Sequence, residues 1–248
     1  MTAHESLDQN FGEYLTPTSD RTVDQRILDK VADFLIAKMP KGDALELGVG
    51  DQVWTPKLLR HFDTVTSVDG SRVLLNAMEQ SLAAVGLRDR WTPEVSLFEE
   101  FRPARRFDVV TVTYVLEHVV DPALILRHCR EHWLKPGGLV VVAVPHSLSL
   151  HRRLAVQMGL IAFPGELGET DRRMEHMHCF SFSEMERIIA EAGYKIEERG
   201  GMFTKALPNA QLADLNDAQL DGLFRLGIDL PIEYSAAIYF LARSLPAA

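Results

Sequence analysis

The feature that most constrains the fold is an alternation of short apolar segments with amphipathic helical segments along most of the chain. Apolar strands joined by helices form a mainly parallel sheet whose two faces are both covered, so the alternation predicts an α/β fold. The predicted strands are 44–47, 64–69, 94–97, 107–115, 139–145, 194–199 and 237–242. The predicted helices are 22–39, 54–61, 71–86, 121–134, 183–193 and 217–227.

These elements predict a doubly wound, mainly parallel sheet. We expect residues 1–248 to form a single domain, in which residues 1–40 make an N-terminal helical cap. A turn is predicted at 135–138. The regular pattern breaks at 146–180, which is interpreted as an insertion after the fifth strand that covers the carboxyl edge of the sheet and the substrate.

Composition excludes several classes of function. The 248 residues carry a net charge of −9 and no large Lys/Arg cluster, which disfavours nucleic acid as a partner. No segment approaches the roughly 20 apolar residues that span a bilayer, and the N-terminus does not resemble a leader sequence, so we expect a cytoplasmic protein without a membrane partner. Cys129 and Cys179 provide neither a disulfide framework nor a metal knuckle.

The segment "LELGVGD" (45–51) follows the first predicted strand and contains Gly48 and Gly50. In doubly wound sheets a glycine-rich turn at this place lets the backbone approach a ligand closely. The third glycine of the dinucleotide motif is absent, because position 52 is Gln. Glycines also end strands for conformational reasons alone, so both interpretations stay open.

Two acidic residues accompany this turn. Asp69 ends the second predicted strand, where an acid can accept hydrogen bonds from ribose hydroxyls, although it could also cap the next helix. Glu46 lies within a buried apolar strand, which is costly unless the carboxylate meets a cation or a set of donors. A positively charged ligand group would satisfy this requirement.

Together these segments resemble the class I S-adenosylmethionine-dependent methyltransferases. "LELGVGD" is similar to their first motif and "SVDGS" (67–71) to their second, while "FDVVTVTYVLEHVVDP" and "WLKPGGLVVVAVP" are similar to their fourth- and fifth-strand blocks. The resemblance covers residues 43–146. It implies a Rossmann-like methyltransferase fold, with a doubly wound seven-stranded sheet that is parallel except for the last strand. It also implies S-adenosylmethionine as cofactor, with Glu46 on the methionine amino group and Asp69 on the ribose.

The resemblance also implies further contacts. The implied cofactor-binding residues are Glu46, Gly48, Gly50, Asp69, Gly70, Leu97, Phe98 and Thr113. For Leu97 and Phe98 a plain core role is the alternative. Substrate binding is predicted for Tyr14, Tyr114, His118, His151 and His178.

Histidines are the candidate bases, because an imidazole with an ordinary pKa of about 6.5 can take a proton near neutral pH. We expect His176 first and His146 second to take or orient the proton of the acceptor. Each histidine could instead be exposed or structural. A metal site formed by Glu117, His118, His176 and His178 is conceivable. Some quinone-pathway members of the family are thought to use a divalent ion, with an acid three positions before the Glu-His pair. Here that position is Tyr114, so no metal is predicted.

The insertion contains the apolar residues Met158, Leu160, Ile161, Phe163, Met174 and Met177. This content fits an adaptable lid over an organic substrate, the interface of a homodimer, or ordinary packing. Segments of the back half, such as "LSLHRRLAVQMGLI", resemble a subgroup of small bacterial methyltransferases that act on small, often secondary-metabolite, substrates. The predicted activity is therefore methylation of a small molecule on oxygen or nitrogen.

Two alternatives are kept. A nicotinamide-dependent oxidoreductase could use a similar sheet, although the missing third glycine and the charge of Glu46 disfavour it. A catalytically inactive protein could also bind the cofactor without turning over a substrate. Fold-level resemblance does not decide between an enzyme and such a binding protein.

Overall fold

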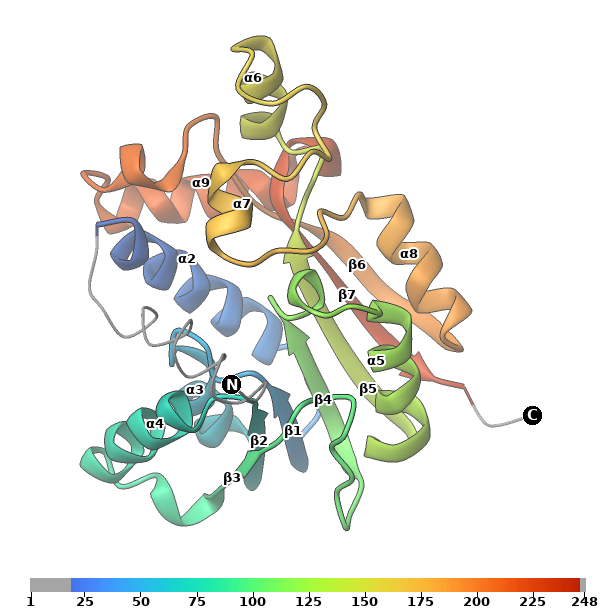
Figure 1. The fold of residues 1–248 in the computed structure, drawn as a ribbon. Coiled ribbons are helices and arrows are strands. Elements are labelled where there is room, and N and C mark those ends of the chain that lie inside the picture. The colour runs from blue at the N-terminus through green and yellow to red at the C-terminus, as the bar shows by residue number, and fades with distance from the viewer. Residues whose placement is uncertain (1–18, 246–248) are drawn as a thin grey trace.

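The computed structural model describes residues 19–245. Its centre is a seven-stranded sheet (Figure 1). The strands are β1 (Asp43–Leu47), β2 (Thr64–Asp69), β3 (Trp91–Val95), β4 (Phe107–Thr113), β5 (Leu134–Pro145), β6 (Tyr194–Thr204) and β7 (Ser235–Ser244). Their order across the sheet is β3-β2-β1-β4-β5-β7-β6. Strands β1 to β5 pair in parallel, and β7 lies antiparallel between β5 and β6. The predicted fold class, with its antiparallel last strand, is confirmed.

Helices connect the strands and cover both faces. The α-helices are α2 (Ser19–Ile36), α3 (Trp54–His61), α4 (Arg72–Ala84), α5 (Pro122–His128), α6 (Leu150–Gln157), α7 (Glu169–Arg173), α8 (Phe182–Glu191) and α9 (Asp217–Asp229). Shorter helical turns are η2 (Arg88–Arg90), η3 (Leu116–His118), η4 (Cys129–Trp133), η5 (Asn209–Leu212) and η6 (Ile232–Tyr234). None of the helices within residues 19–245 is long and apolar enough to cross a membrane.

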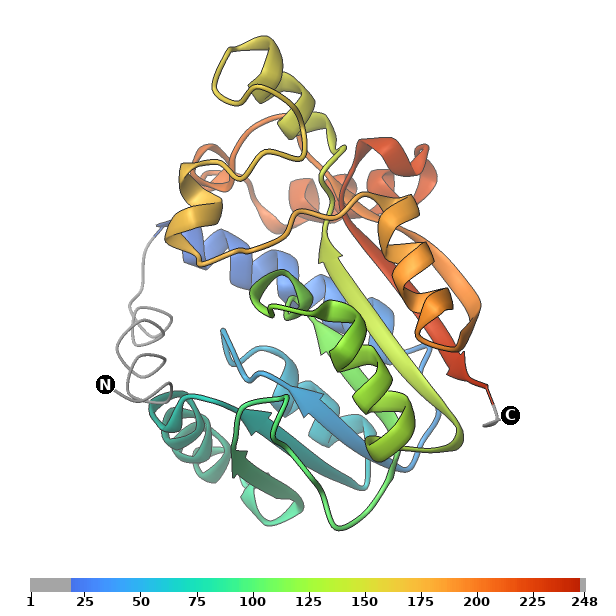
Figure 2. The same cartoon turned by 45° about the vertical axis from the view of Figure 1, so that its right-hand side comes forward.

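The sheet separates two hydrophobic cores. One core joins α2, α3, α4 and α9 to the sheet, and the other joins α5 and α8 to its opposite face (Figure 2). Alternate residues of a strand point to opposite faces, so each buried strand serves both cores: Val109 faces the first and Val110 the second. Burial on both faces explains why these strands appear as continuous apolar runs in the sequence.

The third strand lies at 91–95 rather than at the predicted 94–97. Strand β3 pairs with β2 along its whole length, from Val65 with Trp91 to Asp69 with Val95, so the neighbouring strand sets its register. It is an edge strand with only Trp91 buried, and Pro93 is tolerated there because an edge strand has one unpaired side. The apolar pattern was therefore a poor guide to its position.

Two further boundaries differ from the prediction. Strand β4 ends at Thr113, because Tyr114 adopts a left-handed backbone conformation with φ of +56°. The predicted turn at 135–138 is instead a bulge inside β5, where the pairing with β4 jumps from Phe107–Leu134 to Val109–Leu139. A bulge absorbs extra residues without ending the strand.

The insertion after β5 begins and ends at one place. His146 and Phe180 form an isolated parallel bridge, and the backbone N–H of Ser147 donates to the carbonyl oxygen of Phe180 at 2.8 Å. Between these residues the chain forms α6 and α7, which lie beyond the carboxyl end of β5 (Figure 1). The two ends of the segment 146–180 are thus paired with each other, and its role as a cover over the substrate stays a prediction.

Candidate functional site

The strand order reverses between β1 and β4. After β1 the chain adds β2 and β3 on one side, and then returns to place β4 on the other side of β1. The carboxyl ends of two such strands diverge into loops on opposite faces, and ligands bind in the crevice between them. The glycine turn follows β1, and the segment from Tyr114 to His118 follows β4. Both candidate segments therefore flank the switch point.

The glycine turn leaves room beside the end of β1. Gly48 has φ of +73° and Gly50 has φ of +39°, a region that side chains disfavour. A Cβ atom at Gly48 would lie 3.4 Å from Cγ2 of Val115, at the end of β4, and one at Gly50 would meet no described atom within 4 Å. The turn is fixed to β2 by the backbone N–H of Gly48, which donates to the carbonyl oxygen of Val68 at 2.8 Å.

Glu46 is 2% exposed, and its two oxygens have different surroundings. Oε2 accepts hydrogen bonds from the hydroxyls of Thr55 at 2.7 Å and Ser67 at 2.5 Å. The indole N–H of Trp91 in turn donates to the Ser67 hydroxyl at 2.8 Å. Oε1 is enclosed and has no hydrogen-bond partner within residues 19–245. Burial raises the pKa of Glu46 to about 7, against the effect of the two hydroxyls.

Asp69 connects the glycine turn to the next helix. Its Oδ2 accepts from the backbone N–H of Val49 at 2.9 Å, and its Oδ1 accepts from that of Ser71 at 2.8 Å. The N-cap of α4 is Ser71, whose hydroxyl accepts from the N–H of Leu74. The alternative that Asp69 caps this helix is therefore wrong. Asp69 thus connects the glycine turn to the start of α4, and its contact with a ribose stays a prediction.

The remaining predicted cofactor residues lie around the same edge. Gly70 is buried, and Thr113, at the end of β4, is half-buried. Leu97 and Phe98 lie on the loop after β3, which the backbone hydrogen bond from Ser96 to Asp69 holds beside β2. Phe98 also packs against the core on the α5 and α8 face, which supports the alternative core role for this residue.

Tyr114 and Glu117 form the other side of the switch point. The phenol of Tyr114 packs against the core on the α2 face, and burial together with nearby Glu117 raises its pKa. Glu117 is 1% exposed, and its Oε2 has no hydrogen-bond partner among the described residues. Burial raises the pKa of Glu117 to about 7, and nearby His176 opposes this effect. A second acid that lacks full pairing thus faces the insertion.

The insertion brings His176 to this acid. The backbone N–H groups of Met177 and His178 donate to the carbonyl oxygen of Glu117 at 2.7 and 3.3 Å. The rings of His118 and His176 meet edge to face, with centroids 4.8 Å apart. Burial lowers the pKa of His118 to about 4, so this imidazole is neutral at pH 7. Glu117, His118 and His176 therefore lie together.

Asp171 contacts both His176 and Arg152. Its Oδ1 lies 3.2 Å from Nδ1 of His176, and its Oδ2 lies 3.0 Å from Nη1 of Arg152. Burial alone would raise the pKa of Asp171, but hydrogen bonds from His176 and Gly168 and the charge of Arg152 hold it well below its ordinary value. Asp171 is thus a carboxylate at neutral pH.

Three other predicted histidines contact residues outside the group of Glu117, His118 and His176. His146 is 1% exposed, and its Nδ1 lies 3.1 Å from the carbonyl oxygen of Ser235. His151 lies beside the Ser149 hydroxyl, and its pKa is lowered by burial to about 3. Nε2 of His178 lies 2.9 Å from the carbonyl oxygen of Val119. Roles for them in catalysis or substrate binding stay predictions.

The side chains that could hold a metal ion are those of Glu117, His118 and His176. One ligand atom from each lies within 4.8 Å of the others. His178, the fourth candidate, is not a member of this group within the described residues. Carboxylate and imidazole are suitable ligands for several divalent ions. The prediction that the protein uses no metal stays a prediction.

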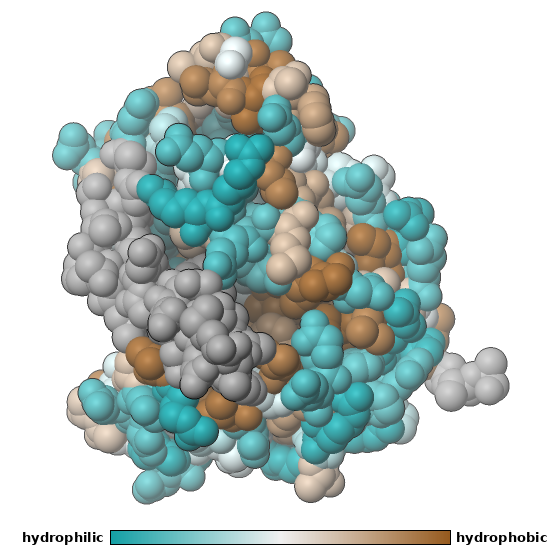
Figure 3. All heavy atoms as spheres, in the orientation of Figure 1, coloured by the Kyte–Doolittle hydropathy of each residue, from teal (hydrophilic) through white to brown (hydrophobic). Residues whose placement is uncertain are grey.

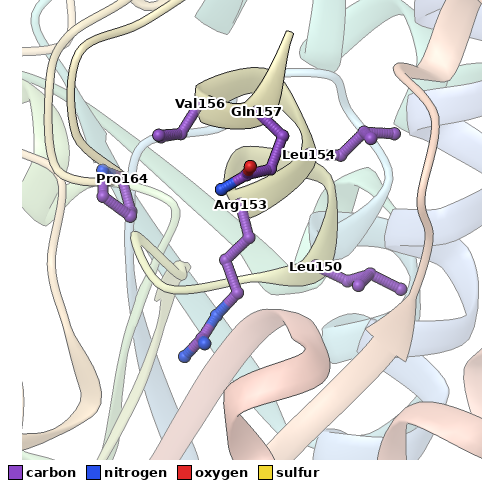
Figure 4. A pocket seen from close by; sticks show the side chains of 6 residues that line it. All are labelled: Leu150, Arg153, Leu154, Val156, Gln157 and Pro164. Carbon is purple, nitrogen blue, oxygen red and sulfur yellow. The ribbon is translucent and has the colours of Figure 1, made fainter.

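The outer part of the insertion is apolar and exposed. No residue of α6 is buried, and Met158, Leu160 and Phe163 are 62%, 69% and 59% exposed. Figure 3 shows hydrophobic side chains gathered at this end of the molecule. A cavity of about 450 Å³ lies beside α6 (Figure 4). It is lined by Leu150, Arg153, Leu154, Val156, Gln157 and Pro164. Ile161 and Met174 of the same insertion are half-buried, so a lid, an interface and ordinary packing all stay open as interpretations.

Sequence reasoning missed four residues that shape the site, and Tyr14 lies outside the described residues. Asp171 and Arg152 lie in an irregular segment, where no periodicity points to a role. Thr55 and Ser67 brace Glu46. Ser67 had a usable signal, because it pairs with Glu46 in the parallel register of β1 and β2 and is a polar residue in a buried strand.

A family model described as a methyltransferase domain matches residues 19–199. The chain belongs to this family. The methyltransferase is also similar to two curated relatives, both described as ubiquinone biosynthesis O-methyltransferase. It is 35% identical to that of Caulobacter sp. (strain K31) over 40% of this chain and 39% of the relative, and 30% identical to that of Parvibaculum lavamentivorans over 64% and 60%. The matched region thus spans about two to three fifths of these relatives.

Solved structures share the fold. The N-methyltransferase NodS from Bradyrhizobium japonicum, in complex with S-adenosyl-L-homocysteine, superposes with a TM-score of 0.59 at 14% identity and covers 97% of each chain. An S-adenosylmethionine-dependent methyltransferase from Mesorhizobium loti gives 0.61 at 19% identity, over 85% of this chain and 96% of the other. The [4+2]-cyclase SpnF gives 0.62 at 16% identity, over 88% and 82%. The predicted membership in class I S-adenosylmethionine-dependent methyltransferases is confirmed.

Proposed function

We propose that this methyltransferase transfers the methyl group of S-adenosylmethionine to an oxygen, or alternatively a nitrogen, of a small organic acceptor in bacterial secondary metabolism. The observation that carries the proposal is the enclosed Oε1 of Glu46, which has no partner within the described residues and lies at the carboxyl end of β1. An enclosed carboxylate oxygen without a donor is costly unless a ligand supplies one. The ammonium group of S-adenosylmethionine is such a donor.

The residues of the switch point fit this cofactor. Glu46 binds the ammonium, Gly48 and Gly50 give room to the methionine portion, and Asp69 accepts from the ribose hydroxyls. Gly70, Leu97, Phe98 and Thr113 complete the contacts to the ribose, the adenine and the methionine portion. The cofactor supplies a methyl group bound to positively charged sulfur, which is a highly activated donor.

The chain must then orient the acceptor, exclude water and accept its proton. Holding the reacting atoms in line is worth about 7 kcal/mol or more, and a positioned base contributes about 10²- to 10⁴-fold. His176 takes this proton in the proposal, which is supported by the contact of its Nδ1 with Asp171, since that contact leaves Nε2 as the nitrogen that can accept. The carboxyl group of Glu117 lies beside it and helps to hold the acceptor.

Oxygen is the favoured accepting atom, because the curated relatives carry the name O-methyltransferase. The exposed apolar surface of α6 and its cavity favour an acceptor with an organic, apolar portion that the insertion covers. The net charge of −9 argues against a nucleic-acid acceptor. We keep the cytoplasm as the location, and a homodimer through α6 as the alternative use of this surface.

The second candidate is a protein of the same fold without methyl transfer. The specific observation that favours it is the superposition with the [4+2]-cyclase SpnF, since a shared fold does not fix activity. The third possibility, a nicotinamide-dependent oxidoreductase, is disfavoured by family membership and by Glu46, whose charge would meet no cation.

The test has two stages. Calorimetry with S-adenosylmethionine, S-adenosylhomocysteine and NAD is expected to show binding of the first two and none of the third. The protein is then incubated with S-adenosylmethionine and a panel of phenols, alcohols and amines, and mass spectrometry searches for methylated products. If neither S-adenosylmethionine nor S-adenosylhomocysteine binds, the proposal is overturned. Binding without transfer to any acceptor would favour the second candidate.

A further inference from the structure

A chain of contacts runs through the insertion to His176. It begins at Arg152 on α6, whose side chain is 12% exposed. Its guanidinium donates to the carbonyl oxygens of Pro164, at 2.5 Å, and of Glu166, and to Oδ2 of Asp171 at 3.0 Å. One side chain thus holds α6, the following loop and α7 in a single arrangement.

Asp171 connects Arg152 to His176. Its Oδ2 also accepts from the backbone N–H of Gly168 at 2.8 Å, which fixes the carboxylate at the start of α7. Its Oδ1 faces Nδ1 of His176 at 3.2 Å. Both oxygens of this half-buried carboxylate are therefore engaged, one toward the rest of the insertion and one toward the imidazole.

His176 is tied to Asp171 twice. Besides the ring contact, the backbone N–H of His176 donates to the carbonyl oxygen of Asp171 at 2.9 Å. The turn between them needs Glu175 in a left-handed conformation, with φ of +57°, a strained state for a side-chain-bearing residue. These two contacts with Asp171, together with the edge-to-face contact with His118, restrict rotation of the imidazole.

The ring contact also selects a tautomer. A carboxylate only accepts hydrogen bonds, so the nitrogen that faces Asp171 must carry the hydrogen. Nε2 is then the nitrogen with a free lone pair, on the side of the ring away from Asp171. Without this contact a neutral imidazole can carry its hydrogen on either nitrogen.

We propose that Asp171 is a positioning residue, held by Arg152, that orients the ring of His176 and keeps Nε2 as its accepting nitrogen. The proposal deepens the proposed function, because it assigns the residue that prepares the base. It also explains why the insertion is built around a mostly buried ion pair. The contacts of Arg152 and Asp171 thereby connect the exposed apolar surface of α6 to the candidate base.

The first test does not require turnover. Nitrogen-15 NMR of the histidine rings at about pH 8.5, well above the ordinary imidazole pKa, reports which nitrogen carries the hydrogen. Comparison with His176→Ala assigns the signals. We expect His176 to carry its hydrogen on Nδ1 in the unmodified protein, and Asp171→Ala to give a mixture of tautomers. The matched control is Glu169→Gln, which removes an exposed carboxylate from the same helix. An Nε2-hydrogen tautomer in the unmodified protein, or an unchanged tautomer in Asp171→Ala, would overturn the proposal.

The second test uses kinetics with an acceptor found as described above. We expect Asp171→Asn to lower kcat by about 10- to 100-fold, because a misplaced base loses much of its 10²- to 10⁴-fold contribution. The KM of the acceptor and the affinity for S-adenosylhomocysteine should change little, and Asp171→Glu should recover part of kcat. An unchanged kcat with a raised KM would show a structural role only. A confirmed tautomer without turnover of any acceptor would count against the proposed function alone.

Discussion

Two glutamates, Glu46 in β1 and Glu117 just after β4, are buried near the switch point, and their surroundings differ. Glu46 lies in a central strand and receives two hydroxyl hydrogen bonds from neighbouring elements, while Glu117 lies in a short helical turn and faces His176 from the insertion. Burial raises the pKa of each to about 7. The proposed cofactor side is therefore built from neighbouring elements of the sheet, whereas the proposed chemical side is completed by residues of the insertion. Four experiments test this difference between the two sides.

The largest effect is expected on the insertion side. His176→Ala should lower kcat by about 100-fold or more, because it removes the candidate base, while the affinity for S-adenosylhomocysteine stays the same. Steady-state kinetics and calorimetry measure the two quantities. The matched control is His132→Ala, which removes an exposed histidine in η4, outside the insertion. A loss of cofactor affinity equal to the loss of kcat would mean that the two sides are not separate.

The second effect is on stability. An unfolded glutamate ionises near pH 4.5 and the folded Glu46 near pH 7, so between these values the folded state binds more protons. The free energy of unfolding therefore falls as the pH rises through this window, by about 3 kcal/mol for one group, and is constant above it. Urea unfolding of the ligand-free protein at pH 5 and pH 8 measures this fall. Glu46→Gln should remove its share, and an unchanged pH dependence in this variant would contradict the expectation.

The third effect concerns the cofactor. Glu46→Gln should weaken binding of S-adenosylmethionine by about 30-fold, because removing one partner of a buried charge pair costs 2 kcal/mol or more. Calorimetry at pH 8, where Glu46 is ionised, gives the affinity. Glu94→Gln, which changes an exposed glutamate in β3, serves as the control. Equal affinities for the two variants would place the ammonium elsewhere.

The smallest effect is expected from metal removal. Treatment with a chelator should leave kcat unchanged, because the group formed by Glu117, His118 and His176 offers a single carboxylate, fewer oxygen ligands than Mg²⁺ prefers. Zn²⁺ accepts one carboxylate and two imidazoles, so it is the ion with which this expectation is tested most severely. The assay compares chelated protein before and after addition of Mg²⁺, Mn²⁺ or Zn²⁺. Loss of activity that one of these ions restores would instead make the three residues metal ligands.

The same contrast explains what could be predicted from the sequence. Periodicity located β2 at its observed bounds and indicated the α/β sheet, because buried strands and helix faces leave a repeating pattern. The antiparallel direction of the last strand came from the family resemblance, because periodicity does not report strand direction. Glu46, Gly48 and Asp69 were noticed because each breaks such a pattern. Asp171 and Arg152 were missed, since their contact joins two parts of an irregular segment. The position of β3 was also missed, because pairing with β2 and not its own apolar pattern sets its register.

The bridge between His146 and Phe180 has a consequence for how this protein can change over time. Because the segment leaves and rejoins the body of the protein at neighbouring points, its length and composition can be altered without shifting any strand. If the proposed function holds, exchanging this one segment would change the acceptor and leave the proposed cofactor residues of β1 and β2 in place. The same two points are natural junctions for grafting the corresponding segment of a relative in the laboratory.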